Sequence, residues 1–373
     1  MATVQELRDY LPRLEGWHYL NYAGTGPILS PTANLLKELS LEAVEPLIVR
    51  WEKWTNFLEK ARDSAARLIN AQANEIAFVR STSDGLSLLA NAVRWKKGDR
   101  VLFPADEFPS NRIVWKNLAS RGVEAQAIAP VPNISFAEQL AGMNLSNVRL
   151  VAVSAVSYRD GRVHDIAKIA SLCRAHQILV CVDAIQAIGS VPLDVRKLGC
   201  DFLSSGGQKW LFGPMGAGFV YIRKERLEEL FVSNAGWKSV KYPINLEDET
   251  FEFSESARRF EPGTLDIPAI AGLGCSIDRM EQIGWPKIYQ AVMDWNKMAQ
   301  KKLKALGYQL LQEQSHSGIA AIRLKDPLTA EKLKKRCDSR KIIVSQRSDY
   351  LRISMHACAV QQDFDVFLEA LEG

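Results

Sequence analysis

A lysine and an aspartate stand at the ends of two apolar segments and could do chemistry together. Lys209 lies in a run of small residues between the strand-like segments 200–203 and 216–222. At the mouth of a strand its amine would lose water and its pKa would fall, as a Schiff-base lysine requires. Asp183 ends the apolar segment 178–183. Pyridoxal 5'-phosphate needs such a pair, because the lysine forms the Schiff base and the carboxylate keeps the pyridine nitrogen protonated. Taken singly, the two residues also fit a surface lysine and a helix-capping aspartate.

A polar run at the junction of a predicted strand and a predicted helix could bind the phosphate of that cofactor. The strand covers 76–80, and the helix begins within Ser81-Thr82-Ser83-Asp84-Gly85. Hydroxyls and free backbone N–H groups at the positive end of a helix suit a phosphate, so Ser83 and Asp84 are candidate cofactor-binding residues. The same residue types are also common N-caps, which stays an alternative for this run alone.

These residues need a scaffold that brings them together. Strand-like and helical runs alternate between residues 76 and 224. The expected strands are 76–81, 100–105, 123–129, 149–156, 178–183, 201–206 and 216–223, and helices are expected at 82–95, 109–121 and 165–176. This alternation predicts an α/β fold with a mainly parallel sheet covered on both faces. Ligands bind at the carboxyl ends of such strands, where Ser83, Asp183 and Lys209 fall.

The rest of the chain predicts more helices and a second, smaller unit. Segment 28–70 is expected to be helical, and a helical stretch at about 266–304 should cross to the C-terminal unit. That unit is expected to hold strands at 318–324, 341–345 and 350–354 and helices at 329–339 and 361–371. We therefore expect a large cofactor-binding domain at 20–272 and a small domain formed by 1–19 and 273–373.

Five segments of the chain together resemble a known enzyme family. They are Tyr19-Leu20-Asn21-Tyr22-Ala23-Gly24, Phe78 to Gly85, Val182-Asp183-Ala184-Ile185-Gln186, Gly207-Gln208-Lys209-Trp210 and Phe260-Glu261-Pro262-Gly263-Thr264. Their order and spacing are similar to those of class V, fold-type I pyridoxal-phosphate enzymes, such as cysteine desulfurases, kynureninase, isopenicillin-epimerase-like proteins and small aminotransferases. The resemblance runs from about Tyr19 to Arg352. It implies a fold-type I transferase with a mainly parallel seven-stranded sheet between helices and a smaller α+β C-terminal domain.

The resemblance also assigns contacts to the cofactor. Phe108 takes the place of the histidine that stacks on the cofactor ring in desulfurases, and it offers a flat apolar cover that cannot transfer protons. Ser157 stands where desulfurases carry an asparagine, and Gln186 is similar to the family residue that contacts the phenolic oxygen. Gln208 replaces a histidine and keeps a donor for the phosphate. Ser205 is a further phosphate candidate, although the family's serine lies one position later.

Substrate contacts and assembly follow from the same resemblance. Arg352 matches the family arginine that binds the substrate α-carboxylate as a bidentate fork. Asn21 and Ala23, in the first matching segment, are assigned to substrate binding. Thr264 resembles the residue that reaches the neighbouring subunit's phosphate, which implies a homodimer with shared active sites. No metal site is expected.

One departure from the family concerns sulfur chemistry. Persulfide-forming desulfurases carry a nucleophilic cysteine on a loop before the carboxylate-binding arginine, but the short segment 344–350 of this chain holds no cysteine. Cys337 falls in a predicted helix, and Cys358 follows the arginine. Without a thiolate nucleophile, sulfur must leave by elimination or not at all. A desulfurase that works through a covalent persulfide is therefore not expected.

Composition narrows the class of protein further. With 373 residues, 47% of them apolar and 24% charged, the chain can bury a large core. The net charge of +4 is spread over interspersed residues with no basic block, so no nucleic-acid partner is expected. Six scattered cysteines and an N-terminus without a signal-peptide pattern predict a cytoplasmic protein. The sequence has no apolar run of membrane-spanning length, so no membrane partner is expected either.

The leading interpretation is a pyridoxal-phosphate-dependent enzyme that acts on an amino acid, of the class V aminotransferase type or a related lyase. Lys209 would carry the Schiff base and then take the Cα proton as general base. The alternatives are a cysteine or cystine C–S lyase, a desulfurase-like enzyme without a persulfide cysteine, an epimerase-like member and a cofactor-free scaffold. Retention of Lys209 and Asp183 argues against the scaffold. Transamination and β-elimination begin with the same deprotonation, so the sequence leaves both open.

Overall fold

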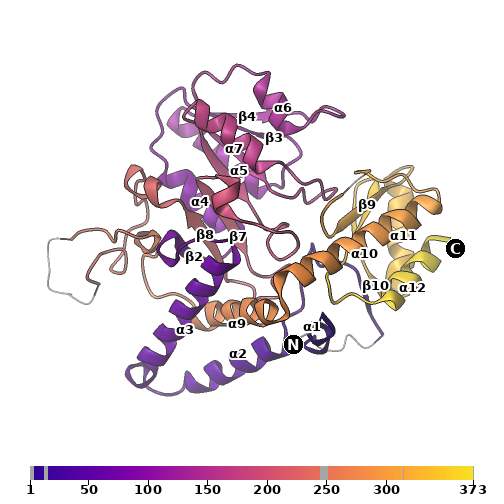
Figure 1. The fold of residues 1–373 in the computed structure, drawn as a ribbon, viewed down its shortest axis with the longest axis horizontal. Helices are drawn as coiled ribbons and strands as arrows, with labels where there is room; N and C mark the ends of the chain where they lie inside the picture. Colours follow the sequence, from indigo (N-terminus) through magenta and orange to yellow (C-terminus); the bar gives the residue numbers. More distant parts are fainter. Residues whose placement is uncertain (1–3, 12–15, 244–250, 314, 373) are drawn as a thin grey trace.

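The larger part of the molecule is built on a seven-stranded sheet (Figure 1). The computed structural model describes residues 4–11, 16–243, 251–313 and 315–372. In spatial order the strands are β2 (Ile76–Val79), β8 (Gly218–Ile222), β7 (Phe202–Gly206), β6 (Leu179–Asp183), β5 (Val148–Ser154), β3 (Arg100–Pro104) and β4 (Glu124–Ile128). Strand β8 runs antiparallel to both neighbours, and every other pair is parallel. The predicted mainly parallel α/β sheet is therefore confirmed.

Helices cover both faces of this sheet. On one face, α4 (Thr82–Ala92) and α5 (Ser110–Lys116) share an apolar core with strand residues such as Val101 and Phe202. On the other face lie α3 (Leu47–Leu68), α6 (Phe136–Ala141), α7 (Ile166–Ala175) and α9 (Ile267–Ile283). Buried strands must be apolar toward both layers, which is why β6 and β7 are buried at all five positions.

Side-chain caps fix where several of these helices begin. Ser81 accepts a hydrogen bond from the Asp84 N–H at the start of α4, and Asp165 accepts one from the Lys168 N–H at the start of α7. Asp266 caps α9 in the same way. Each such cap is worth about 1 kcal/mol of helix stability. The start of α4, which faces the carboxyl end of the sheet, is thus defined by the sequence.

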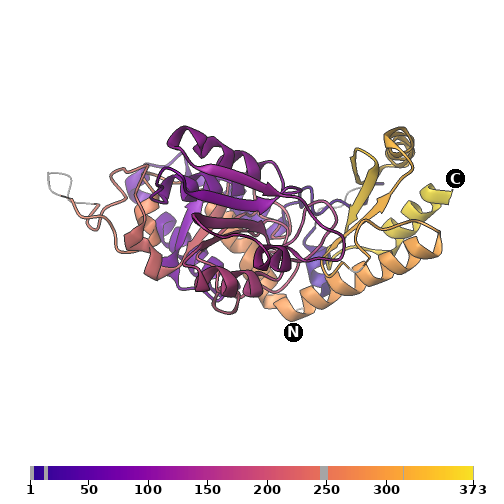
Figure 2. The same ribbon diagram turned by 90° about the horizontal axis from the view of Figure 1, so that it is seen from above.

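A long helix, α10 (Trp285–Ala305), leads from the sheet to the smaller part (Figures 1 and 2). There, β9 (Ile319–Arg323), β12 (Tyr350–Ser354) and β11 (Ser345–Arg347) form an antiparallel sheet in the order β11-β12-β9. One face of this sheet contributes to a separate apolar core with α11 (Pro327–Ser339) and α12 (Gln361–Glu372). The predicted smaller α+β unit is confirmed.

The N-terminal segment packs beside the C-terminal one. Strand β1 (His18–Tyr19) pairs in parallel with β10 (Ile342–Ile343), and Arg8 Nη1 of α1 (Val4–Asp9) donates to the Cys358 carbonyl at 3.0 Å. The expected division into domains stays a prediction, and its boundary at residue 272 lies inside α9. The remaining elements are α2 (Ser30–Glu42), η1 (Ala73–Glu75), η2 (Asn117–Arg121), α8 (Val195–Leu198), η3 (Lys224–Glu229) and η4 (Ala257–Phe260).

Two long helical predictions are each divided in the structure. Segment 28–70 is split into α2 and α3 just before Leu47, where Pro46 is extended and cannot continue a helix. The stretch 266–304 is split into α9 and α10 at Gly284, whose φ of 102° is open to glycine. Within the described ranges, none of the helices is apolar over a stretch long enough to span a bilayer.

Candidate active site

Asp183 and Lys209 meet at the carboxyl edge of the large sheet. Asp183 is the last residue of β6 and is 2% exposed, and the Ile185 N–H donates to its Oδ1 at 3.0 Å. Burial raises the pKa of Asp183 to about 6, while the Lys209 charge acts in the opposite direction. Burial, followed by the charge of Arg352, lowers the pKa of Lys209 to about 8, and Asp183 partly offsets this. The predicted pair is therefore brought together, and a lysine with this pKa is readily made a nucleophile.

The turn that carries Lys209 is held by the N-terminal segment. The Gly26 N–H and the Thr25 hydroxyl both donate to the Gln208 carbonyl, at 2.8 and 3.0 Å. A Cβ at Gly26 would lie 2.2 Å from the Lys209 carbonyl oxygen, so only glycine lets the two chains approach this closely. The lysine is thus positioned by backbone contacts rather than by its own side chain.

The predicted phosphate loop lies at the positive end of α4. Ser83 is exposed there, and its hydroxyl lies 2.7 Å from the Ser110 hydroxyl. The Asp84 carboxylate accepts from the Arg80 N–H and guanidinium, while the Asp84 N–H is used by Ser81. Asp84 therefore shapes the turn, and its charge is matched by Arg80. Of the two predicted residues, Ser83 is the one whose side chain has a proton to donate to an anion.

The end of β7 reaches this loop through a different serine from the one predicted. The Ser204 hydroxyl donates to the Thr82 carbonyl at 3.1 Å, and the Gly206 N–H donates to the Thr82 hydroxyl at 2.9 Å. Ser205, the predicted residue, points to the other face because side chains alternate along a strand. Its hydroxyl donates to the Gly206 carbonyl at 2.9 Å. The structure therefore does not bring the Ser205 hydroxyl to α4.

Two predicted residues lie over the lysine or beside it. The Phe108 ring is 39% exposed, and its centroid is 5.9 Å from Lys209 Nζ. It also makes an edge contact with Tyr158, with the ring centroids 5.1 Å apart. Ser157 is buried, and its hydroxyl oxygen accepts from the Arg159 N–H at 3.3 Å. Phe108 is thus placed to cover a flat ring. The Ser157 hydroxyl, by contrast, already accepts a hydrogen bond within its own loop.

Gln186 is largely engaged with the protein itself. Its Nε2 donates to the Ala23 carbonyl at 3.0 Å, and its Oε1 accepts from Trp210 Nε1 at 2.9 Å. One N–H of the amide is left for a ligand. The contact of Gln186 with the phenolic oxygen of the cofactor stays a prediction. The observed hydrogen bonds of Gln186 connect Ala23 to Trp210, the residue after Lys209.

Arg352 closes the site from the small sheet. The side chain is 2% exposed, its Nη1 donates to the Tyr158 carbonyl at 2.5 Å, and its Nη2 lies 3.5 Å from Asn21 Oδ1. Its buried Nε has no hydrogen-bond partner among the residues that the structure describes. Burial, followed by the charge of Arg347, lowers the pKa of Arg352 to about 10, so the group is still a cation at neutral pH. A buried donor without a partner is costly, and a carboxylate would satisfy it.

Asn21 and Thr264 differ in whether they contact the residues of the site. Asn21 touches Arg352, and its neighbour Ala23 donates its N–H to the Ser354 hydroxyl at 2.8 Å. Thr264 is exposed and makes no hydrogen bond through its side chain within the described ranges. Its segment is anchored by Glu261, which pairs with the buried Arg62 at 2.7 Å. The structure therefore gathers Asn21 and Ala23 into the site of one chain but not Thr264.

Sequence reasoning missed two charged residues at this site. Glu107 is buried next to Phe108, and its carboxylate accepts from the Ser154 N–H at 2.6 Å. Burial is the main reason that the pKa of Glu107 rises to about 7, and the Asp183 charge adds to the rise. Arg347 is exposed on β11, and its charge lowers the pKa values of Lys209 and Arg352. Glu107 directly follows Asp106 after β3. This position near a strand end was the only feature of the sequence that could have marked Glu107 as a site residue.

The two cysteines near Arg352 in sequence are unsuited to nucleophilic attack. Cys337 lies on α11 in the apolar core of the small unit, and burial raises its pKa to about 11. Cys358 is 3% exposed, its thiol lies 3.5 Å from the Tyr22 hydroxyl, and burial raises its pKa to about 12. Both thiols are protonated at neutral pH, and neither is a good nucleophile.

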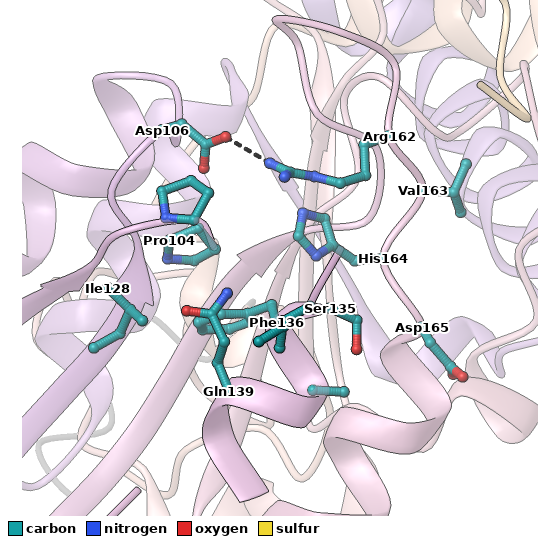
Figure 3. Close-up of a pocket in the computed structure, with 13 residues that line it drawn as sticks. Pro104, Asp106, Ile128, Ser135, Phe136, Gln139, Arg162, Val163, His164 and Asp165 are labelled. Atoms are coloured by element: carbon teal, nitrogen blue, oxygen red, sulfur yellow. Dashed lines mark hydrogen bonds and ion pairs between the residues drawn. The ribbon is translucent and has the colours of Figure 1, made fainter. Parts of the chain in front are cut away.

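A small pocket next to the site is lined by none of the predicted site residues. It has a volume of about 130 Å³ and lies between α6 and the segment 162–165 (Figure 3). Asp106 and Arg162 form an ion pair of 2.5 Å in its wall, so their charges are matched. His164 also lines it, and burial lowers the pKa of this histidine to about 4.

The gathered groups fit the cofactor predicted from the sequence. Lys209 offers an amine, Asp183 offers a carboxylate that is held by the backbone, and Phe108 offers an apolar cover over the lysine. The Ser83 hydroxyl stands at the start of α4, which suits a phosphate. These are the donor types that pyridoxal phosphate requires.

Comparison with known proteins gives the same result. The model of the family "Aminotransferase class-V" matches residues 18–365. A probable cysteine desulfurase from Methanothermobacter thermautotrophicus is 32% identical over 293 residues, which are 76% of this chain and 72% of that protein. The uncharacterized aminotransferase YcbU from Bacillus subtilis is 27% identical over 94% of this chain and 93% of that protein.

Solved structures show the same fold. The apo structure of a cysteine desulfurase from Thermococcus onnurineus NA1 superposes with a TM-score of 0.88 at 23% identity, over 100% of this chain and 98% of that one. The complex of the cystine C–S lyase C-DES with cysteine persulfide gives a TM-score of 0.89 at 23% identity, over 95% and 97% of the two chains. The predictions of family and cofactor are confirmed, and the chain belongs to the aminotransferase class-V family of pyridoxal-phosphate enzymes.

Proposed function

We propose that this protein deprotonates an α-amino acid at Cα and completes the reaction as an aminotransferase, with Lys209 as the base. The observation that carries this proposal is the meeting of Lys209 and Asp183 at the edge of the large sheet with Arg352 from the small sheet, where the charges of Asp183 and Arg352 both act on the pKa of Lys209. When bound there, pyridoxal phosphate supplies an electron sink for the electrons left on Cα.

Each residue of the chain has a distinct task in this proposal. Arg352 binds the α-carboxylate through its unpartnered Nε and so orients the Cα–H bond. Lys209, freed as a neutral amine, takes the Cα proton, because a pKa lowered to about 8 leaves about a tenth of the amine unprotonated at pH 7, far more than for an ordinary lysine. Asp183 stays ionised beside a cationic partner and fixes the ring orientation. Phe108 covers the site and keeps water from the lysine.

A second candidate function is a C–S lyase on cysteine or cystine. Several relatives are named cysteine desulfurases, and C-DES is a cystine C–S lyase of the same fold. In this chain the described thiols nearest to Arg352 in sequence are buried and protonated, so sulfur would leave by elimination and not through an enzyme persulfide. Both candidates share the step at Lys209, and they differ in the fate of the product.

A product assay separates the two candidates. Purified holoenzyme is incubated with a panel of amino acids that includes cysteine and cystine, with and without a keto-acid acceptor. Without the acceptor, an aminotransferase forms at most one equivalent of keto acid per active site, and it turns over repeatedly only when the acceptor is present. A lyase turns over without the acceptor and releases pyruvate and ammonia with sulfide from cysteine or with cysteine persulfide from cystine. Lys209→Ala is the control. A wild-type protein that forms none of these products with any member of the panel would contradict the proposal.

We also infer that the protein works as a homodimer in the cytoplasm, with Thr264 of one chain at the phosphate of the other. Thr264 is exposed at the start of the segment that leads into α9, and its backbone is fixed by the buried Arg62–Glu261 pair. Thr264→Val should weaken cofactor retention by about 1 kcal/mol, the scale of one hydrogen bond to a charged group. Sedimentation that shows a monomer with full cofactor affinity would contradict the shared site.

A further inference from the structure

We propose that Arg347 binds a second anionic group of the substrate, so that this site selects α-amino acids whose side chain ends in a carboxylate or a similar anion. The inference rests on the proposed function, because it takes Arg352 to hold the α-carboxylate. It assigns Arg347 as a specificity-determining residue.

The register of the small sheet places the two arginines on one face. Across β11 and β12, Ser345 lies opposite Arg352, and Arg347 lies opposite Tyr350. Residues directly opposite each other in an antiparallel pair share a face, and so do residues two apart along a strand. Arg347 and Arg352 are therefore diagonal neighbours on the same face, with Cα atoms about 7–8 Å apart.

That face is the one turned toward the large sheet. The alternate residues Leu351 and Ile353 belong to the apolar core of the small unit, so they define the opposite face. Arg352 donates to the Tyr158 carbonyl, which belongs to the large unit and lies next to Phe108. Arg347 thus lies on the face of the small sheet that is turned toward the site. It is one pair of opposed residues away from Arg352, the arginine that binds the α-carboxylate in the proposed function.

The positive charge on this face is not matched by the protein. Within the described ranges, no acidic side chain lies within 4.0 Å of the Arg347 guanidinium, and the acid of the same hairpin, Asp349, pairs with Arg323 at 3.3 Å. Arg159 adds another cation, 5.6 Å from the centroid of the Tyr350 ring. The charge of Arg347 is felt at Lys209 and Arg352, whose pKa values it lowers.

Such an arrangement favours a ligand with two anionic groups. One carboxylate at Arg352 would still leave the Arg347 charge unmatched, whereas a second anion at the far end of the substrate would pair with it. Arginine suits this role because its planar fork binds carboxylates with two parallel hydrogen bonds.

Binding of unreactive acids to the holoenzyme tests the inference. Glutarate and butyrate carry two and one carboxylates and have no amino group, so they bind without turnover. Their affinities are measured by calorimetry for the wild type and for Arg347→Gln, Arg347→Lys and Arg323→Gln. Arg323→Gln is the matched control, because Arg323 lies on the same sheet but is already paired with Asp349.

We expect the wild type to bind glutarate roughly tenfold or more tightly than butyrate, the scale of one hydrogen-bonded charge pair. Arg347→Gln should erase this preference and leave butyrate unchanged, Arg347→Lys should keep part of it, and Arg323→Gln should keep all of it. A preference that survives Arg347→Gln, equal loss for both acids or no preference in the wild type would each overturn the inference.

Failure of the proposed function would look different. In that case the protein would not show the visible absorption of a lysine-bound cofactor, or butyrate binding would not depend on Arg352. If both of these properties are present and Arg347 has no effect on glutarate, only the inference about the second anion is wrong.

Discussion

The edge of the large sheet and the hairpin of the small sheet bring opposite kinds of residue to one site. At the large sheet, Asp183 and Lys209 are held by backbone contacts, and burial shifts their pKa values to about 6 and about 8. At the small sheet, Arg352 is buried with an unpartnered Nε and Arg347 is exposed. In the proposed function, the first region takes the proton from Cα, a step that all amino-acid substrates share. The second region would distinguish substrates by the charge of their side chains. In this proposal, the reaction and the selectivity are thus assigned to different units of the chain.

Neutralising the aspartate at the large sheet should have the largest effect. Asp183→Asn should lower kcat by about 100-fold or more, because the ring nitrogen loses the charge that keeps it protonated. The substitution also removes a charge that raises the pKa of Lys209, so that pKa should fall below 8. Steady-state kinetics measure the fall in kcat, and the pH dependence of chemical modification of Lys209 in the cofactor-free protein measures its pKa. Near-normal turnover would show that Asp183 only caps the end of β6.

Replacing Arg352 on the small sheet should weaken substrate binding. Arg352→Gln should lower kcat/KM roughly 10- to 100-fold, because two hydrogen bonds to the α-carboxylate are lost. Cofactor binding should persist, since the described contacts of Arg352 are with Tyr158 and Asn21. Comparison of amino acids with the matching amines provides the control. An equal loss for an amine, which has no carboxylate, would contradict the assignment.

At the large sheet, Glu107 should also make the free energy of unfolding depend on pH. Its pKa is about 7 in the folded chain and about 4.5 when exposed, so the folded state holds the proton more tightly. This contribution to stability is therefore complete below pH 4.5 and is lost as the pH rises through 7. In the cofactor-free protein, Glu107→Gln should remove roughly 2 kcal/mol of the fall in unfolding free energy between pH 5 and 8. Urea unfolding at several pH values measures this, and an unchanged slope in the variant would refute it.

The smallest effect is expected from the cysteines. Cys337→Ala and Cys358→Ala should each leave turnover within a few-fold of the wild type, because both thiols are buried and protonated. Mass spectrometry after turnover of cysteine provides a second readout. A persulfide on either residue would restore a desulfurase that uses an enzyme thiol.

Much of the fold could be read from the sequence because its signals are local. Each central strand is an apolar run, and the helices between the strands follow from spacing and N-caps such as Ser81. Asp183 and Lys209 could be found because each ends or follows such a run. The two helix breaks were missed, since the pattern stays helical across Pro46 and Gly284.

Features that depend on contacts between distant segments could not be predicted. Glu107 is explained by its bonds to Ser154, which lies 47 residues away. The choice between Ser204 and Ser205 depends on which face of β7 meets α4, and no local pattern of residues indicates which face that is. Arg347 became relevant only when the hairpin register placed it beside Arg352.

Chemical reduction shows which lysine holds the cofactor, and we expect it to be Lys209. The purified holoenzyme is treated with borohydride, which fixes the cofactor on the amine that carries it, and is then digested and analysed by mass spectrometry. Cofactor on the peptide that contains Lys209, and none in Lys209→Ala, is the predicted result. Cofactor on another lysine, or no bound cofactor at all in the wild type, would contradict the account.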